Sequence, residues 1–394
     1  MSVLIHVRRP AFVVAAAASA ALLAAAPAVA APNWTIVSSP NPSPALNGLD
    51  GVFARTATDA WAVGQVGETA NTEGNAGLAL HWNGTAWTSV PVPDPQFRNE
   101  RLFAVDGTSA NDVWAVGAAA TAQNQVPREV FAMHWNGTAW ALTPVQTGPT
   151  GTARGGLNAV AAISPTNVWI GGRSRSGNVL IEHWNGTAWT VAPTPAVNST
   201  INDLAVVSPT NIWAVGGGLV NADGTRTALI MHYDGSSWQR VTNQVSVPAN
   251  FVAHRGLFGI TALSATDIWA VGTATDRLSV DQPVIQHWNG TRWTRVAAPA
   301  APANTSHQDL NGIAAVSATE IYAVGDITNA TDATSSGMVL RWNGTAWVRE
   351  SVAHSTAGSD SLGDVAATPG GGPLWAVGTS FAGGTTTLTF ITRR

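Results

Sequence analysis

Carboxylate and amide side chains recur at the start of a short phrase that the sequence repeats, and they are the first candidates for chemistry. They occupy the two positions after a Leu or Ile: Asp50, Asn158, Asn202, Asp203, Asn311 and Asp364. Small residues such as Gly51 and Ala104 fill most of the other second positions. If the repeats surround a central channel, these carboxylates and amides form a ring that could bind an ion or a sugar. The alternative is that they only line the channel and contact water.

Basic and imidazole side chains stand just before the same phrase: Arg101, Arg154, His254, Arg255 and His307. Catalysis would need two carboxylates that face a cleft, or a histidine with a metal and a water molecule. Asp203 with Asp364, and His254 with His307, are candidate pairs that nothing in the local sequence couples. The sequence also lacks a phosphate-binding loop, a nucleophile elbow and an H-E-x-x-H motif. It therefore names no catalytic residue, and the question of an enzyme stays open with a preference against it.

Five histidines recur once per repeat, at His81, His134, His183, His232 and His287. Histidines on separate repeats are too far apart to share one metal ion. We expect each to be a buried hydrogen-bonding residue that ties its strand to a neighbour. No metal and no cofactor is predicted.

Two phrases repeat along the chain with a period of about 50 residues, which is typical of a propeller blade or a solenoid unit. The first, LDGVFARTATDAWAVG from Leu49, occurs seven times in all, and the second, LALHWNGTAWTSVPVP from Leu78, occurs six times in all. Each repeat divides into four short strands, as at 49–54, 60–64, 78–82 and 85–90. The Asn-Gly pair between the last two predicts a two-residue hairpin of type I′. A glycosylation sequon in the same Asn-Gly-Thr string is the less favoured interpretation.

The last repeat stops after its third strand, at about Thr386 to Ile391, while an unmatched outer strand stands at 33–42. We therefore expect the N-terminal strand around Trp34 to close the ring. All 18 Trp fall at repeated strand positions, where large flat rings fill the space between blades. The predicted fold is an all-β, seven-bladed propeller of four-stranded blades over residues 31–394, its last blade closed by the N-terminal strand.

Residues 1–30 have the features of a secretory signal peptide. Arg8 and Arg9 precede an apolar run, and Ala28-Val29-Ala30 fits a cleavage site. A membrane anchor is the alternative, and the export route stays open. The predicted mature protein is secreted, extracellular and free of the membrane. A net charge of −4 argues against nucleic acid as a partner, and the absence of Cys excludes disulfides and thiolate chemistry.

WAVGG at Trp213–Gly217 resembles the end of a kelch second strand, and HWNGTAWT with the Pro-rich stretch after it resembles kelch strands three and four. The resemblance implies a kelch-like propeller. Kelch copper oxidases need a Cys cross-linked to a Tyr, and a chain without Cys cannot have that activity. The repeats are also similar to those of uncharacterised secreted actinobacterial proteins with WAVG and HWNGTAW repeats, which imply no function.

The loops divide the predicted propeller into two unlike faces. Turns between the first and second strands, and between the third and fourth, are short and uniform, whereas the other connections are long and irregular. Binding residues usually lie on irregular loops of a rigid scaffold. The sequence predicts a monomeric binding module that recognises an extracellular glycan or protein at the channel mouth on that face. A polysaccharide hydrolase or lyase at the same mouth is the alternative. A lectin with one site per blade would repeat its site residues, so the irregular rim is favoured.

Overall fold

The computed structural model describes residues 34–67, 74–95, 98–120, 128–146, 155–220, 226–242, 251–355, 358–383 and 386–394. These residues form 28 strands, and none of them lies in an α-helix. The predicted signal peptide, residues 1–30, lies outside the described residues. In the part of the chain that is described, no helix is long and apolar enough to cross a membrane.

The strands follow one another as antiparallel meanders. The first three comprise β2 (Leu46–Thr56), β3 (Asp59–Gly67), β4 (Ala76–Trp82) and β5 (Trp87–Val90); β6 (Arg98–Ser109), β7 (Asp112–Ala120), β8 (Arg128–Trp135) and β9 (Trp140–Thr143); and β10 (Gly156–Ser164), β11 (Asn167–Arg173), β12 (Val179–Trp184) and β13 (Trp189–Val191). Then come β14 (Ile201–Ser208), β15 (Asn211–Val220), β16 (Arg226–Tyr233) and β17 (Trp238–Arg240); β18 (Phe251–Ser264), β19 (Asp267–Asp276), β20 (Asp281–Trp288) and β21 (Trp293–Val296); and β22 (Thr305–Ser317), β23 (Glu320–Asn329), β24 (Ser335–Trp342) and β25 (Trp347–Glu350). The chain ends with β26 (Ser359–Ala367), β27 (Leu374–Phe381) and β28 (Thr387–Arg393).

The N-terminal strand completes the last sheet. β1 (Thr35–Ile36) pairs with β28, which gives the four-stranded order β1-β28-β27-β26. Three other sheets are separate and four-stranded, and β14–β25 form one twelve-stranded sheet. Single bridges at Gly217–Gly256 and Asp281–His307 join its meanders. The predictions of an all-β chain, of four-stranded sheets and of an N-terminal strand in the last sheet are confirmed.

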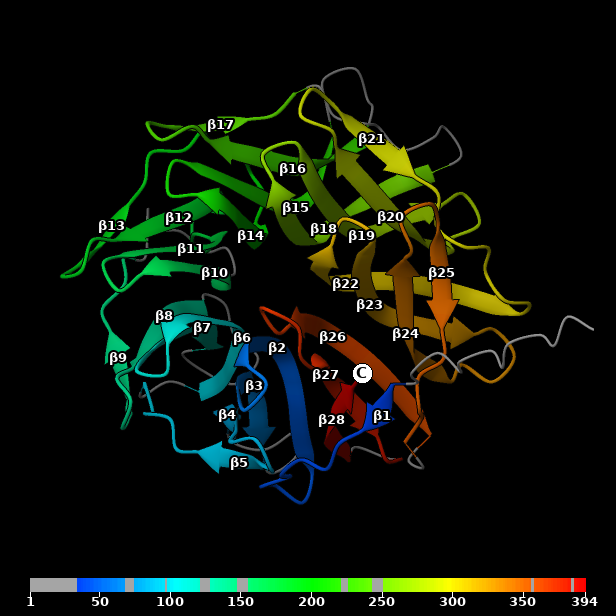
Figure 1. The fold of residues 1–394 in the computed structure, drawn as a ribbon, viewed down its shortest axis with the longest axis horizontal. Helices are drawn as coiled ribbons and strands as arrows, with labels where there is room; N and C mark the ends of the chain where they lie inside the picture. Colours follow the sequence, from blue (N-terminus) through cyan, green and yellow to red (C-terminus); the bar gives the residue numbers. More distant parts are fainter. Residues whose placement is uncertain are drawn as a thin grey trace, which may run out of the picture. The chain divides into compact units, whose positions relative to one another are not determined.

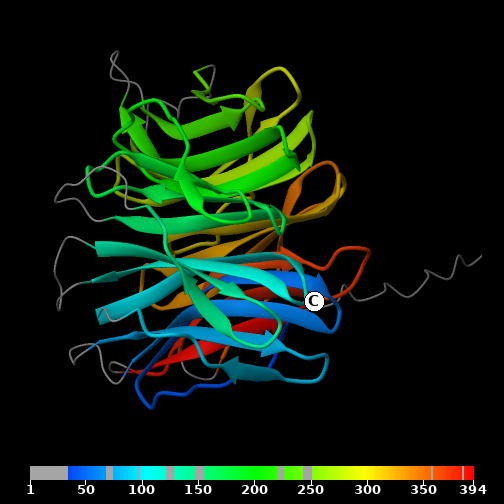
Figure 2. The same cartoon turned by 90° about the vertical axis from the view of Figure 1, so that its left-hand side faces the viewer.

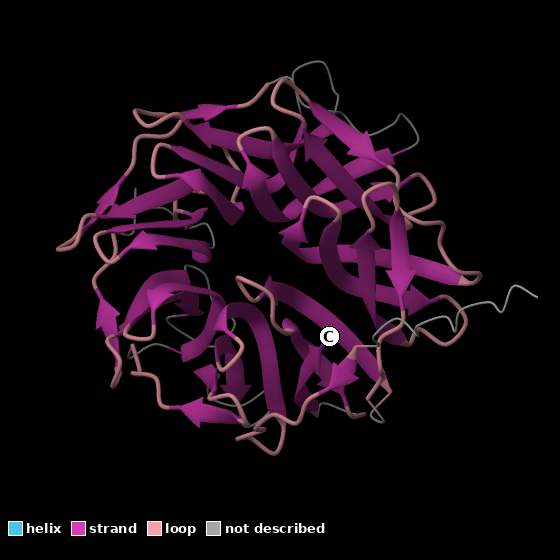
Figure 3. Cartoon of the chain, viewed as in Figure 1, coloured by secondary structure: helices cyan, strands magenta, loops and turns pink. Residues whose placement is uncertain are grey.

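Within the unit Asn33–Arg394, the sheets surround a central axis (Figure 1), and no helix covers them (Figure 3). The first strand of each meander is innermost: β2, β6, β10, β14, β18, β22 and β26. Each contacts the next, and β26 contacts β2, so the ring is closed. Turned by 90°, the same unit shows its sheets stacked one against the next (Figure 2).

Tryptophan rings fill the interfaces between sheets. Trp61 of β3 lies 5.0 Å from the ring of Trp135 and 5.2 Å from that of Trp140, both in the next sheet. Trp375 of β27 makes the corresponding contacts with Trp82 and Trp87 of the first sheet, at 4.9 and 5.1 Å. Edge-to-face and tilted pairs at these distances are favourable. The structural role predicted for the tryptophans is confirmed at these positions.

The repeated histidines bind the residue that begins the neighbouring strand. Nε2 of His81 lies 2.8 Å from Oδ1 of Asp59, and its ring lies over Trp61 at 4.5 Å. His134 and Asp112 repeat the arrangement at 2.7 Å. The predicted tie between strands is confirmed, although these side chains are half-buried rather than buried. In the first two meanders the polar residue of the turn is thus the histidine's partner.

The Asn-Gly hairpins differ from the prediction. Trp82 pairs with Trp87, so four residues connect the strands where two were expected. Gly84 has a φ of 95°, but Asn83 is not among the residues with positive φ, so the turn is not type I′. Oδ1 of Asn83 instead accepts hydrogen bonds from the amides of Thr85 and Ala86 and from the Thr85 hydroxyl. A side chain that satisfies the turn amides replaces the backbone geometry that the dipeptide suggested.

Candidate binding site at the channel mouth

One cavity lies where the innermost strands begin. Its volume is about 430 Å³, and every innermost strand lines it with the residue after the Leu or Ile that opens the repeated phrase: Asp50, Phe103, Asn158, Asn202, Phe258, Asn311 and Gly363. Leu49, Arg101, Ser361, Gly378, Thr379 and Phe381 complete the wall. Five of the predicted site residues, Asp50, Arg101, Asn158, Asn202 and Asn311, are therefore brought together in one cavity.

Asp50 and Arg101 form an ion pair in the wall. Nε of Arg101 donates to Oδ2 of Asp50 at 2.7 Å, and Nη2 donates to Oδ1. Burial lowers the pKa of Arg101, but the hydrogen bonds and the charge of Asp50 raise it, with a net rise. The guanidinium also lies 5.4 Å from the centre of the Phe103 ring. This contact is a cation–π interaction, and the pair is fixed by two fork-like hydrogen bonds.

Three asparagines link their own innermost strands, β10, β14 and β22, to the next one. Nδ2 of Asn202 donates to the carbonyl of Leu257 at 2.8 Å, and Nδ2 of Asn311 donates to that of Leu362 at 3.0 Å. Nδ2 of Asn158 donates to the carbonyl of Ile201 at 3.0 Å and to Oγ1 of Thr200 at 2.9 Å. These bonds fix the orientation of the side chains at the mouth.

Asp203 and Asp364, predicted to lie at the mouth, are not among the residues that line this cavity. The carboxylate of Asp203 accepts hydrogen bonds from the backbone amides of Leu204 and Ile260, both at 2.8 Å. Asp364 accepts those of Val365 and Val52, at 2.8 and 2.9 Å. Each carboxylate thus bridges its own innermost strand and the following one, and the second bridge joins β26 to β2.

Asp106 makes the same kind of bridge, from β6 to β10, through the amides of Gly107 and Ala162 at 2.8 Å. It stands four residues after Leu102, outside the two positions that the sequence pattern singled out. Burial raises the pKa of Asp203 to about 8, that of Asp106 to about 7 and that of Asp364 to about 6, although the amides oppose the rise. The negative charge of Asp364 contributes to the rise at Asp203.

Arg255 and His307 meet at a carboxylate that the sequence pattern did not indicate. Nη2 of Arg255 lies 3.1 Å and Nδ1 of His307 3.3 Å from Oδ2 of Asp281, whose side chain is 3% exposed. These residues are not among those that line the cavity. The predicted residue Arg154 lies outside the described residues, and so does the side chain of His254, whose backbone belongs to β18. The predicted pair of His254 and His307 therefore includes a side chain that lies outside the described residues.

A cross-strand pair of carboxylates stands behind part of the wall. Asp309 of β22 faces Asp326 of β23 in register, and the Ser361 hydroxyl donates to Oδ1 of Asp326 at 3.2 Å. Burial and the charge of Asp309 raise the pKa of Asp326 to about 6, and the hydrogen bonds of Ser361 and Asn311 oppose the rise. Ser361 and Asn311 both line the cavity, so Asp326 accepts hydrogen bonds from two residues at the mouth.

A neighbouring cavity extends the mouth. It has a volume of about 210 Å³, and Phe103 and Asn158 line both cavities. Arg173 and Thr200 form part of its wall. The two cavities adjoin at these residues of the innermost strands β6 and β10.

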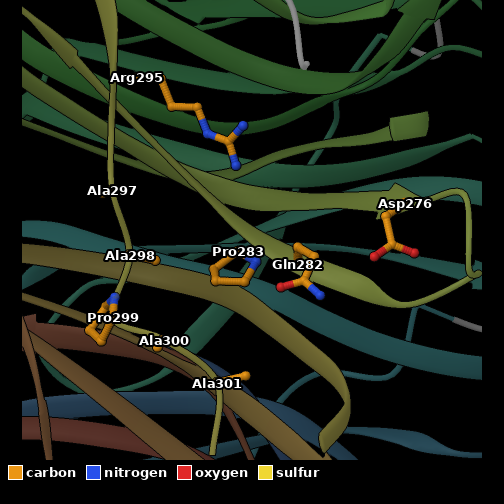
Figure 4. Close-up of a pocket in the computed structure, with 9 residues that line it drawn as sticks. All are labelled: Asp276, Gln282, Pro283, Arg295, Ala297, Ala298, Pro299, Ala300 and Ala301. Carbon is orange, nitrogen blue, oxygen red and sulfur yellow. The ribbon is translucent and has the colours of Figure 1, made fainter. Parts of the chain in front are cut away.

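A larger cavity, of about 560 Å³, lies in the meander β18–β21 (Figure 4). Arg295 and, in the linker after β21, Ala297, Ala298, Pro299, Ala300 and Ala301 form one side, and Asp276, Gln282 and Pro283 form the other. It draws on one meander and its linker, whereas every innermost strand contributes a residue to the channel mouth. Since binding sites combine an apolar wall with a few converging polar groups, the mouth is the stronger candidate despite its smaller volume.

No protein-family model matches the sequence, and no curated protein matches it. Solved structures match its fold. YCF48 bound to D1 peptide aligns with a TM-score of 0.55 and 12% identity over 93% of this chain and 96% of that one. Virginiamycin B lyase from Staphylococcus aureus has a TM-score of 0.53, with 11% identity over 88% and 94%. An ulvan lyase of polysaccharide lyase family PL25 has 0.52, with 10% identity over 84% and 91%. The chain is a β-propeller. At these identities the likeness shows the fold alone, and the kelch-like resemblance stays a prediction.

Proposed function

We propose that this protein is a secreted seven-bladed propeller that binds a glycan at the channel mouth. The observation that carries the proposal is the cavity to which every innermost strand contributes at least one residue. Its volume of about 430 Å³ is within the range of small-molecule sites, roughly 300–1,000 Å³. The adjoining cavity beside Phe103 and Asn158 provides room for a second sugar unit.

The chemistry of the wall suits a sugar. Phe258 offers an apolar ring against which the C–H face of a sugar can pack, and Phe381 adds a second. Asn202, Asn311 and Thr379 offer hydrogen-bonding groups for its hydroxyls. The pairing of Arg101 with Asp50 leaves these two lining residues without net charge, so a strongly anionic ligand is not favoured.

The alternative, a hydrolase or lyase at the same mouth, has less support. A hydrolase of the usual kind needs two carboxyl groups that flank the scissile bond. Asp50 is the one carboxylate among the lining residues, and it is held by Arg101. Asp203 and Asp364 are held by backbone amides. In the described ranges, no group of three or more His, Cys, Asp or Glu is arranged to hold a metal ion.

The mature protein, tested against a glycan array and then by isothermal titration calorimetry, is expected to bind one ligand per chain. Phe258→Ala removes part of the apolar wall and should weaken binding about tenfold, which corresponds to about 1.4 kcal/mol. Leu278→Ala is the matched control, because Leu278 is 83% exposed and does not line the cavity. Its affinity should equal that of the wild type.

Three results would contradict the proposal. Release of reducing ends or of unsaturated sugars from a polysaccharide would identify an enzyme. A stoichiometry near one site per repeat would place binding on the blades instead of the mouth. Equal affinity of the Phe258→Ala variant and the wild type would remove the cavity from the binding surface.

A further inference from the structure

We infer that the glycan bound at the channel mouth carries a free amino group, so that the site takes an amino sugar in its ammonium form. This inference rests on the proposed function and adds the ligand class to it. Three features support it: the orientation of the asparagine amides, an aromatic ring on a strand between two of them, and an excess of carboxyl groups behind the wall.

The orientation of the asparagines follows from their partners. A backbone carbonyl can only accept a hydrogen bond, so the side-chain atom that faces it must be the amide nitrogen. Asn202 faces the carbonyl of Leu257 in this way, and Asn311 faces that of Leu362. Asn158 uses both of its N–H groups, on Ile201 and Thr200.

The carboxamide oxygens are left for a ligand. In the described part of the chain, no donor is hydrogen-bonded to Oδ1 of Asn158, Asn202 or Asn311, and none of these atoms is buried without a partner. Ser361 gives its hydroxyl proton to Asp326, so its oxygen also remains an acceptor. Four oxygen atoms of the wall are therefore acceptors that a ligand can use. An ammonium group brings three donors and no acceptor, which is the complementary inventory.

Phe258 provides the aromatic part of the site. It belongs to β18, which contacts β14 with Asn202 on one side and β22 with Asn311 on the other. A cation over an aromatic ring is attracted by the negative face of the ring, and amide oxygens beside the ring can accept its N–H groups. Arg101 already covers Phe103, the other ring at the corresponding position. The protein thus places its own cation on one of the two rings.

Carboxyl groups outnumber cations behind the part of the wall that Asn311 and Ser361 form. Asp309 and Asp326 stand behind Asn311 and Ser361. Arg101 is paired with Asp50. Arg255 and His307 lie on Asp281 and also act on Asp309, so the three carboxyl groups of Asp281, Asp309 and Asp326 share one arginine and one histidine. An additional positive charge from the ligand is therefore attracted to this side of the mouth. An N-acetylated sugar lacks that charge.

The test compares three oligosaccharides of equal length and linkage by calorimetry on the mature protein: a β-1,4-glucosamine oligomer, its N-acetylated form and a cellulose oligomer. We expect the glucosamine oligomer to bind at least about tenfold more tightly than the other two, with an affinity that falls as salt rises. Phe258→Leu keeps an apolar side chain but removes the ring. It should lower the affinity for the glucosamine oligomer more than the affinity for the cellulose oligomer and so reduce the preference for the amine, while Leu278→Ala should change neither affinity.

Each outcome separates the two proposals. Equal or tighter binding of the N-acetylated or cellulose oligomer would overturn the amine inference and leave glycan binding intact. Absence of binding by every oligosaccharide would overturn both. A lysine-rich peptide is titrated in the same way. If it bound more tightly than the glucosamine oligomer, the proposal of a glycan ligand would be overturned, and recognition of an amine would remain. An unchanged preference in Phe258→Leu would exclude the ring from recognition of the amine.

Discussion

Replacement of Trp114 by Ala is expected to lower the free energy of unfolding by about 3–5 kcal/mol. Trp114 is 1% exposed and lies between two sheets. Its ring is 4.3 Å from His134 in its own sheet and 5.2 and 5.3 Å from Trp184 and Trp189 in the next. Its indole N–H donates to Asp112 at 3.1 Å. Alanine would leave a cavity at the interface, and the rigid strands on both sides could collapse only in part.

Chemical denaturation followed by circular dichroism measures the change. Trp114→Phe keeps an aromatic ring and should lose distinctly less stability than Trp114→Ala. Leu278→Ala is exposed and should stay within about 0.5 kcal/mol of the wild type. A Trp114→Ala variant as stable as Leu278→Ala would show that the tryptophans do not hold the sheets together.

The stability of the protein is expected to fall as the pH rises from about 7 to about 8.5, because of the buried bridging carboxyls. Burial raises the pKa of Asp203 to about 8, far above the value of about 3.9 in an unfolded chain. The folded state therefore binds the proton more tightly than the unfolded state does. The stabilisation is complete when the pH is below the pKa of Asp203 in the unfolded chain, and it is lost as the pH rises through the pKa of Asp203 in the folded protein. The maximum slope for one carboxyl is about 1.4 kcal/mol per pH unit.

Asp203→Asn isolates this contribution, since it removes the titration and keeps one oxygen acceptor for a backbone amide. Urea unfolding at several pH values should give a variant whose stability depends less steeply on pH than that of the wild type. His183 and His232, whose pKa values are lowered by burial, act at lower pH and with the opposite sign, so the window above pH 7 is the informative one. Identical slopes for variant and wild type, or a stability that rises with pH in this window, would contradict the prediction.

Local repetition determined which parts of the fold could be predicted. The Leu49 phrase and the Trp61 and Trp87 positions recur, so four-stranded sheets and an N-terminal strand in the last sheet followed from the sequence. The turn at Asn83 did not, because Asn-Gly is compatible with several hairpins and the choice depends on the bonds of the Asn side chain. A pattern shows which positions are equivalent, but not which side chain satisfies which amide.

The candidate site shows the same limit. Asp50, Asn158, Asn202 and Asn311 share a repeat position, and that position proved to line the mouth. Asp203 and Asp364 stand one residue later, and one step along a strand turns a side chain to the other face. Asp106 and Asp281 stand at positions where the other repeats carry no carboxylate, so no pattern singled them out. Their roles depend on contacts across separate strands.

A crystal structure of the mature protein with a bound oligosaccharide tests the central proposal most directly. The account predicts density for the sugar at the channel mouth, in contact with Phe258 and within hydrogen-bond distance of the side chains of Asn202 and Asn311. Density for the sugar in the cavity beside Arg295 and Pro299, or on the outer strands, with the mouth filled by water alone, would contradict it.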